Sequence, residues 1–398
     1  MSQIDHPGRR RLRDCRRIVV KVGTRLITGD GSLLNARFLD QVAQQMTVLR
    51  ERGPEVDGEV LEDSGRDFEF IIVTSGAIFL GRRILGVSRS KDSLSIRQAA
   101  AAAGQPRLMH HWSEALHSRG LRCAQMLLTL DDMADRGRYL NVRNTIETLL
   151  DNDVIPVINE NDSVSVEGIT FEENDRLAAM VASTAQADLA IYLSDLRGFY
   201  TADPRKDDSA ELLSAVEPEE DYRHCAQGAG GPESRGGMIA KLKAARTLSD
   251  CGVPVVMASG HTERVISRII GGENIGTFFV PRERVQARKQ WMATAGHPSG
   301  VVVVDEGARD ALQASDGSSL LPIGIVDVQG SFSSGDLVRI MDPNGTEVAR
   351  GLSNYSAEEV RKIAGAHTRE ISDILGHVGH DEVVHRDNMV MAENFRPR

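Results

Sequence analysis

Short apolar runs alternate with segments of helical periodicity along the first 281 residues. The run at 18–22 is rich in β-branched residues, and residues 37–52 then carry apolar side chains at the spacing of one helix face. Strands that alternate with helices in this way form a mainly parallel sheet covered by helices on both faces, so the sequence predicts a three-layer α/β/α sandwich. Further strands are predicted at 70–74, 121–129, 155–159, 188–195 and 253–259, and further helices at 95–118 (as two helices), 141–153, 174–187 and 237–252.

The pattern changes after Pro281. A charged stretch is followed by short apolar runs separated by glycine turns, with one helix expected at 356–364, which predicts a small mixed-β domain. The expected organisation has four parts: a basic N-terminal arm at 1–17, an α/β domain at 18–282, a linker at 283–298 and a mixed-β domain at 299–398.

The overall composition is that of an ordinary globular protein. Of 398 residues, 41% are hydrophobic and 26% charged, and no apolar run approaches the ~20 residues that span a bilayer. The four cysteines are far apart and include no CxxC pair, which argues against a disulfide framework and a cysteine-based zinc site. The first residues lack the layout of a secretory signal, so we expect a cytoplasmic protein without a membrane segment.

The net charge of −10 disfavours nucleic acid as the main partner. The exception to this charge is local, because six arginines lie between Arg9 and Arg17. Such an arm could contact phosphates, but short charged termini are usually solvated, and a solvated arm is the expectation here.

Polar residues gather where the predicted strands end. They include Lys21, the turn 74–76, the acidic and amide cluster Asn159–Asp162, and Ser194-Asp195. In a parallel α/β sheet, ligands bind beyond the carboxyl ends of the strands. A lysine inside the apolar run IVVKV is costly to bury unless its ammonium group meets an anion. These residues therefore predict a ligand pocket at one edge of the sheet.

Each of these motifs has a plain structural alternative. Gly23-Thr24 could be only a tight turn, and Ser75 and Asn174-Asp175 could be helix caps. The glycine-rich stretch that contains Gly236 and Gly237, followed by Lys241, could bring backbone N–H groups to phosphate oxygens. It is not a P-loop, and no GxGxxG follows the first strand, which disfavours a Rossmann dinucleotide site.

Taken in order, the motifs resemble those of the glutamate 5-kinase family, whose catalytic domain has the amino-acid kinase fold. The matching segments cover residues 18–391, and the C-terminal part is similar to a PUA domain. The segments are VVKVGT, VTSGAI, RQAAAAAGQ, QMLLT, NVRNT, PVINEND, EENDRLAA, LSDLRGFYTADPR, GGMIAK, SSLLPIGI and HRDNM.

The resemblance implies ATP-dependent phosphorylation of the side-chain carboxylate of L-glutamate, with Mg²⁺ accompanying ATP. It implies that Lys21 and Lys241 stabilise charge on the transferred phosphoryl group, and that Asp175 holds both lysines. The glutamate-binding residues would be Ser75, Asp162 and Asn174. The ATP-binding residues would be Lys21, Gly23, Thr24, Ser194, Asp195, Arg235, Gly236, Gly237, Met238, Ile239, Ala240 and Lys241. The sequence does not identify protein ligands for the metal.

Several positions depart from the family's usual pattern. Arg25 stands where a small hydroxyl residue is general, and Arg235 replaces a small residue before Gly-Gly. Ile239-Ala240 replaces a more polar pair, and Glu173 stands where aspartate is common. An acidic stretch at 54–69 looks additional and is expected to be an exposed loop.

Other functions remain open on sequence alone. One alternative is a kinase of the same fold for another carboxylate or carbamate acceptor. Another is an RNA-binding protein that uses the arginine arm and the PUA-like domain. The C-terminal sequence, however, has no basic, aromatic-rich stripe that would suit RNA. His377, His380 and His385 have a spacing that could suit zinc, although a surface turn is the favoured interpretation. The resemblance further implies feedback inhibition by proline, a homo-oligomer and a glutamyl-phosphate reductase as partner.

Overall fold

The computed structural model shows two compact units, Met1–Pro281 and Arg282–Arg398. Within the described part, no helix is long and apolar enough to cross a membrane. The described residues are 6–29, 34–56, 59–60, 67–87, 93–134, 136–164, 173–202, 204, 207–220, 222, 232–282, 298–314, 318–377 and 380–392.

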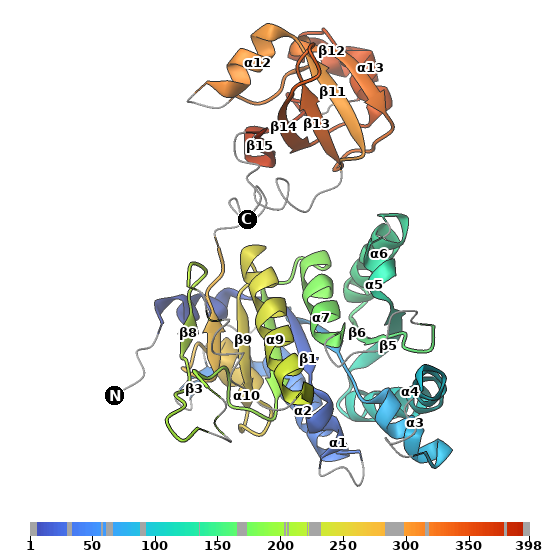
Figure 1. The fold of residues 1–398 in the computed structure, drawn as a ribbon, viewed down its shortest axis with the longest axis vertical. Helices are drawn as coiled ribbons and strands as arrows, with labels where there is room; N and C mark the ends of the chain where they lie inside the picture. The colour runs from blue at the N-terminus through green and yellow to red at the C-terminus, as the bar shows by residue number, and fades with distance from the viewer. Residues whose placement is uncertain are drawn as a thin grey trace. The chain divides into compact units, whose positions relative to one another are not determined.

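The first unit is built on an eight-stranded sheet (Figure 1). The strand order is β5-β6-β4-β1-β7-β9-β10-β8, and the first six strands run parallel, whereas β10 runs antiparallel to β9. This arrangement confirms the mainly parallel sheet. The strands are β1 (Arg17–Val22), β4 (Glu69–Val73), β5 (Arg122–Leu128), β6 (Val154–Glu160), β7 (Leu189–Ser194), β8 (Ala215–Val216), β9 (Val255–Ser259) and β10 (Thr277–Phe279).

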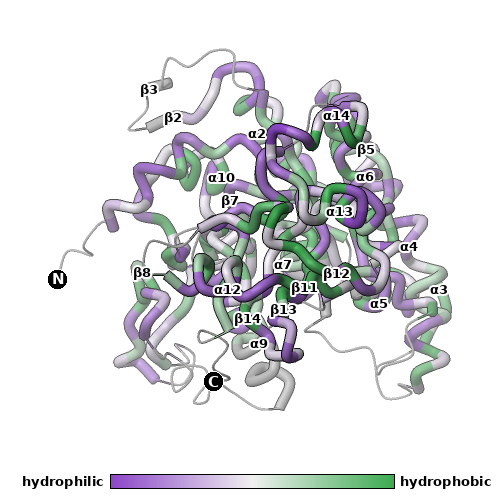
Figure 2. The backbone as a smooth tube through the Cα atoms, turned by 90° about the horizontal axis from the view of Figure 1, so that it is seen from above, coloured by the Kyte–Doolittle hydropathy of each residue, from purple (hydrophilic) through white to green (hydrophobic). Residues whose placement is uncertain are grey.

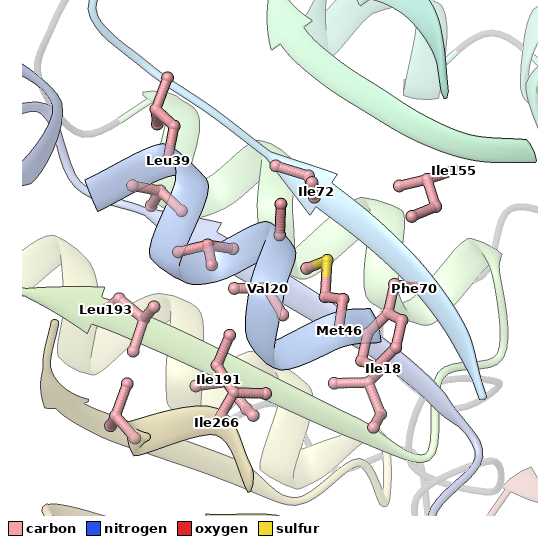
Figure 3. Close-up of a cluster of buried hydrophobic side chains, with 14 of the residues drawn as sticks. Ile18, Val20, Leu39, Met46, Phe70, Ile72, Ile155, Ile191, Leu193 and Ile266 are labelled. Atoms are coloured by element: carbon pink, nitrogen blue, oxygen red, sulfur yellow. The ribbon is translucent and has the colours of Figure 1, made fainter. Parts of the chain in front are cut away.

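Helices cover both faces of this sheet, as the alternation of strands and helices predicts. One apolar core lies between the sheet and α1, α2, α3, α4 and α10 (Figure 3), and the other lies between the sheet and α5, α6, α7 and α9. The strands are buried on both faces by these apolar cores, which is why they read as continuous apolar runs. The helices are α1 (Thr24–Thr28), α2 (Ala36–Arg52), α3 (Ala77–Leu85), α4 (Leu94–His117), α5 (Leu130–Ala134), α6 (Arg136–Asp151), α7 (Glu173–Thr184), α9 (Pro232–Asp250) and α10 (Val265–Ile270).

The helix α4 corrects one prediction, because it is a single helix where two were expected. Pro106 lies inside it without ending it. Tertiary contact explains this continuity, since α4 packs backbone-to-backbone on α3. A Cβ added at Gly104 would come within 1.9 Å of the Ala77 carbonyl oxygen, and one at Gly81 within 1.6 Å of the Ala100 carbonyl oxygen. The two glycines allow a helix contact that holds α4 together across the proline.

The basic arm also differs from its expectation. Residues Pro7–Asp14 form a 3₁₀ helix, and Figure 2 shows this N-terminal segment as hydrophilic along most of its length. Nevertheless Arg9 is fully buried, and its guanidinium donates to the carbonyls of Ser214 (2.8 Å), Ile275 (3.0 Å) and Gly276 (3.0 Å). The prediction of a solvated arm was therefore wrong for this segment, because one arginine satisfies several buried carbonyls at once.

The acidic stretch at 54–69 contains a short antiparallel pair, β2 (Glu55–Val56) and β3 (Glu59–Val60). Residues 57–58 and 61–66, and the side chains of the two strands, lie outside the described part of the chain.

The second unit is a five-stranded mixed sheet with strand order β12-β11-β13-β14-β15 around its own apolar core. In the described part of the chain, no three His, Cys, Asp or Glu side chains cluster as metal ligands. His377 instead contacts Glu359 at 3.2 Å, and His385 contacts Asp387 at 3.6 Å. The elements are β11 (Gly300–Val304), α12 (Glu306–Gln313), β12 (Ile325–Gly330), β13 (Leu337–Met341), β14 (Glu347–Leu352), α13 (Ala357–Ile363), α14 (Ile371–Leu375) and β15 (Met389–Met391).

Candidate active site at the carboxyl edge of the sheet

The central strand β1 delivers Lys21 to the edge of the sheet. Successive side chains of a strand point to opposite faces, so Lys21 shares a face with Val19, whereas Val20 and Val22 belong to the core on the other face. The face of Val19 is the one covered by α7 and α9, which lie side by side (Figure 1). Strand periodicity therefore directs the lysine toward these two helices.

Asp175, in the first turn of α7, completes the centre of the site. Its carboxylate is fully buried and contacts two ammonium groups: the Lys21 Nζ on Oδ1 and the Lys241 Nζ, from α9, on Oδ2 at 3.0 Å. Only 4% of the Lys21 side chain and 21% of the Lys241 side chain are exposed. One carboxylate thus faces two cations, and the three groups together carry a net charge of +1. This cluster, Lys21–Asp175–Lys241, therefore has a positive charge left to attract an anion, while the carboxylate offsets the repulsion between its two cations.

The charges of the cluster control one another's ionisation. Burial alone would raise the pKa of the Asp175 carboxyl, but the Lys21 and Lys241 ammonium groups outweigh it and hold that pKa below its ordinary value. Burial lowers the pKa of Lys21; the Asp175 carboxylate opposes this shift, and repulsion from Lys241 adds to it. Asp175 is therefore an anion across the neutral pH range, and Lys21 titrates below an ordinary lysine.

Tyr192, on β7, holds the backbone of Asp175 in place, a role that the sequence did not predict. Its hydroxyl donates to the Asp175 carbonyl oxygen at 3.1 Å, so strand β7 is tied to the first turn of α7. Burial raises the pKa of Tyr192 well above its ordinary value, and the negative charge of Asp175 adds to this shift. The hydroxyl therefore stays a neutral hydrogen-bond donor. A lone tyrosine in an apolar strand reads as a core residue; only the strand–helix packing gives it this partner.

The residues expected for glutamate gather at the ends of neighbouring strands. Ser75 follows β4 and Asp162 follows β6, and both are buried. Asn174 lies beside Asp175 at the start of α7, and its amide oxygen is buried without a hydrogen-bond partner among the described residues. Asn159 is also buried, and its amide nitrogen donates to the Gln105 side chain at 2.8 Å. The ends of two neighbouring strands and the start of one helix therefore supply these polar side chains.

A tryptophan fixes the turn that carries Ser75. The Trp112 indole N–H of α4 donates to the Thr74 hydroxyl at 2.8 Å, and both side chains are fully buried. Gly76 follows with a left-handed backbone (φ 107°), which glycine adopts without strain. The turn is thus held from the α4 side and cannot shift without breaking a buried hydrogen bond.

The opposite flank of the cluster is formed by the turn after β1 and the end of β7. The Gly23 N–H donates to the Leu193 carbonyl at 3.0 Å, and a Cβ at this glycine would meet that oxygen at 3.1 Å. Thr24 opens α1, and the Ser194 hydroxyl accepts from the Leu196 N–H at 3.2 Å. Helices after β1 and after β7 cover opposite faces, so this flank is the topological switch point of the sheet, where α/β proteins bind ligands.

The glycine-rich stretch before Lys241 has a different boundary from the predicted one. Helix α9 begins at Pro232, so the stretch from Arg235 to Lys241 lies inside the helix. Proline is favoured at the first helical position, which makes Pro232 a better start than the glycines. Nothing is described of the side chains of Arg235 and Ile239, nor of residues 223–231. Met238 packs against the core of this face, and Ala240 is buried.

Comparisons with known proteins agree with this geometry. The family model "Amino acid kinase family" matches residues 16–259, and the model "PUA domain" matches residues 300–375. The chain therefore belongs to the amino acid kinase family.

The relatives place it more narrowly. The "Glutamate 5-kinase" of Citrifermentans bemidjiense is 44% identical over 96% of this chain and 98% of its own length. The protein of the same name from Azoarcus sp. is 43% identical over 96% of this chain and all of its own length. Within the amino acid kinases, this chain is a member of the glutamate 5-kinase group.

Proposed function

We propose that this chain transfers the γ-phosphoryl group of ATP to the side-chain carboxylate of L-glutamate, giving L-glutamyl 5-phosphate and ADP, the first step of proline biosynthesis. The observation that carries the proposal is the Lys21–Asp175–Lys241 cluster at the carboxyl edge of the sheet. One carboxylate oxygen forms a bond to the γ-phosphorus, and the bond from that phosphorus to the β,γ-bridging oxygen breaks.

The chemistry suits a site with cations and no general base. A carboxylate is already ionised at pH 7, so no proton must be removed before it attacks. The obstacle is the approach of two anions, and a site overcomes it by aligning them and neutralising their charge. Lys21 and Lys241 supply that charge at the transferred phosphoryl group. Asp175 binds both ammonium groups, one on each carboxylate oxygen, and so offsets their mutual repulsion.

The polar side chains beside the cluster suit an amino acid. We assign Asp162 to the α-ammonium group of glutamate, because this group requires a negative partner. The amide oxygen of Asn174, which has no hydrogen-bond partner in the described part of the chain, can accept a second hydrogen bond from the same group. Ser75, on the turn fixed by Trp112, is assigned to glutamate as well.

We assign the nucleotide to the flank formed by β1, β7 and α9. The assignment comprises Lys21, Gly23, Thr24, Ser194, Asp195 and the segment from Arg235 to Lys241. Mg²⁺ enters with ATP, and because it readily keeps phosphate oxygens and waters as ligands, it would neutralise charge on the triphosphate without a dedicated protein cage.

Regulation and assembly belong to the same proposal. Proline would inhibit by occupying the glutamate pocket, and glutamate turnover that is unchanged in excess proline would exclude this. A homo-oligomer in the cytoplasm and a glutamyl-phosphate reductase that collects the labile product complete the proposed setting. We do not assign RNA binding to the chain, and salt-sensitive retention of structured RNA in a filter-binding assay would require it to be assigned.

The test is to trap the acyl phosphate with hydroxylamine in the presence of ATP. Glutamate is compared with acetylglutamate, aspartate and no acceptor, and hydroxamate is expected from glutamate alone. Lys241→Ala should abolish the signal, whereas Lys243→Ala, which alters an exposed lysine on the same helix, should leave it unchanged. Asp162→Ala should mainly raise the KM for glutamate. Hydroxamate formed only from another acceptor would overturn the proposed substrate.

A further inference from the structure

Arg25 lies in the first turn of helix α1, directly after β1, and reaches across the switch point of the sheet. Its Nη1 contacts the Asp195 Oδ2 at 2.6 Å, directly after β7. The backbones of the two strands meet immediately below this pair, through the hydrogen bond from Gly23 to Leu193. The ion pair therefore joins the residues after β1 to the residues after β7, on the flank assigned to the nucleotide.

We propose that Arg25 is an additional phosphate-binding residue that moves from Asp195 to the terminal phosphates of ATP when the nucleotide enters. This inference rests on the proposed function, because it takes the nucleotide to lie on the flank of β1 and β7. It adds a third cation to Lys21 and Lys241, from a position where the sequence departs from the family's usual small hydroxyl residue.

The exposure of the pair is what makes the movement feasible. The Arg25 side chain is 64% exposed, and an ion pair in such a position contributes little to folding because water screens it. Releasing Arg25 from Asp195 therefore costs little. The buried Lys21, by contrast, is committed to Asp175 and cannot leave it without exposing an unpaired charge to an apolar surrounding.

The donor geometry favours phosphate as the second partner. A guanidinium group carries five N–H donors, and in the described part of the chain only Nη1 of Arg25 has a partner. The planar group can bind two phosphate oxygens at once, which a lysine cannot do. A triphosphate offers more negative charge than the single Asp195 carboxylate, so the arginine gains by the exchange.

The experiment measures the binding of ATP, ADP and AMP to the full chain by titration calorimetry, without turnover. Arg25→Ser restores the small hydroxyl residue, and Arg25→Lys keeps the charge without the paired donors. For Arg25→Ser we expect about 10- to 100-fold weaker ATP binding, from the loss of hydrogen bonds to a charged group, and less than about twofold weaker AMP binding. Arg25→Lys should fall between Arg25→Ser and the unaltered chain.

The exposed Arg37 on α2 provides the matched control, and Arg37→Ser should leave all three affinities unchanged. Equal losses for ATP, ADP and AMP in Arg25→Ser would overturn the proposal, because they would mean that Arg25 acts only by holding Asp195. An unchanged ATP affinity would overturn it as well. If the unaltered chain binds ATP but forms no glutamate hydroxamate, the proposed function fails while the role of Arg25 stands; if it does not bind ATP, both fail.

Discussion

Replacing Asp175 by asparagine should expose what holds the two lysines together. The side chain keeps its shape and loses its charge, so Lys21 and Lys241 face each other without an anion between them. Lys21 is 4% exposed, and removing the partner of a buried charge typically costs about 3–5 kcal/mol. Activity should fall by about 100- to 1,000-fold, which is the usual cost of losing one aligned charge-stabilising group.

The assay combines urea unfolding with hydroxamate formation. Asp175→Asn should lower the urea midpoint, and the double variant Lys21→Met with Asp175→Asn should recover most of that loss, because the unpaired ammonium group is gone. The double variant should remain inactive. A single variant as stable as the unaltered chain, or a double variant less stable than the single one, would refute the view that Asp175 compensates a buried cation.

The lowered pKa of Asp175 also predicts how the folding stability changes at acidic pH. The pKa of Asp175 is held below its ordinary value, so the folded state keeps this carboxylate ionised where the unfolded chain has begun to bind a proton. The stabilisation is present above about pH 4 and is lost as the pH falls through the lower folded-state pKa, at up to about 1.4 kcal/mol per pH unit. Asp175→Asn should show a shallower loss of stability in this range. An identical acid limb in both proteins would contradict the assignment.

Three further predictions concern the pH dependence of activity and the packing of α4 and of the N-terminal segment. Because burial lowers the pKa of Lys21, kcat/KM should begin to fall on the alkaline side below pH 10.5, and a profile flat to that pH would contradict the need for its ammonium group. Gly104→Ala should destabilise the chain by about 1–3 kcal/mol in urea unfolding, because the added Cβ meets the Ala77 carbonyl of α3. The control is Gly307→Ala in α12 of the second unit, where the added Cβ would lie 3.4 Å from the Asp305 side chain and should cause no loss of stability. Arg9→Ala should lower the free energy of unfolding by several kcal/mol, and so lower the urea midpoint, because it leaves buried carbonyls without donors. Arg10→Ala, at an exposed arginine, should leave the midpoint unchanged. Equal midpoints for the two variants would show that the carbonyls find other donors.

Much of the fold follows from local periodicity. The apolar runs predicted the six parallel strands β1, β4, β5, β6, β7 and β9, and the helical stripes predicted the long helices α2, α6, α7 and α9, because each of these elements displays its buried face in its own few residues. The shorter helices α1, α3, α5 and α10 were not predicted. The polar residues at the strand ends also led to the prediction of a ligand pocket at one edge of the sheet, since carboxyl ends of parallel strands share one edge, and this pocket stays a prediction. Local pattern failed where a distant contact decided the outcome: α4 continues through Pro106 because α3 packs against it.

The amino-acid sequence by itself determined the fold class, the edge of the sheet at which we expect the chemistry, and the presence of a lysine in the first strand that is costly to bury. Only the tertiary structure decided which groups share that cost: it set Asp175 between Lys21 and Lys241, added the Tyr192 hydroxyl beneath it and buried Arg9 among carbonyls. The physical reason is that periodicity reports whether a side chain is buried, whereas the partner that satisfies a buried polar group comes from segments far away in the chain.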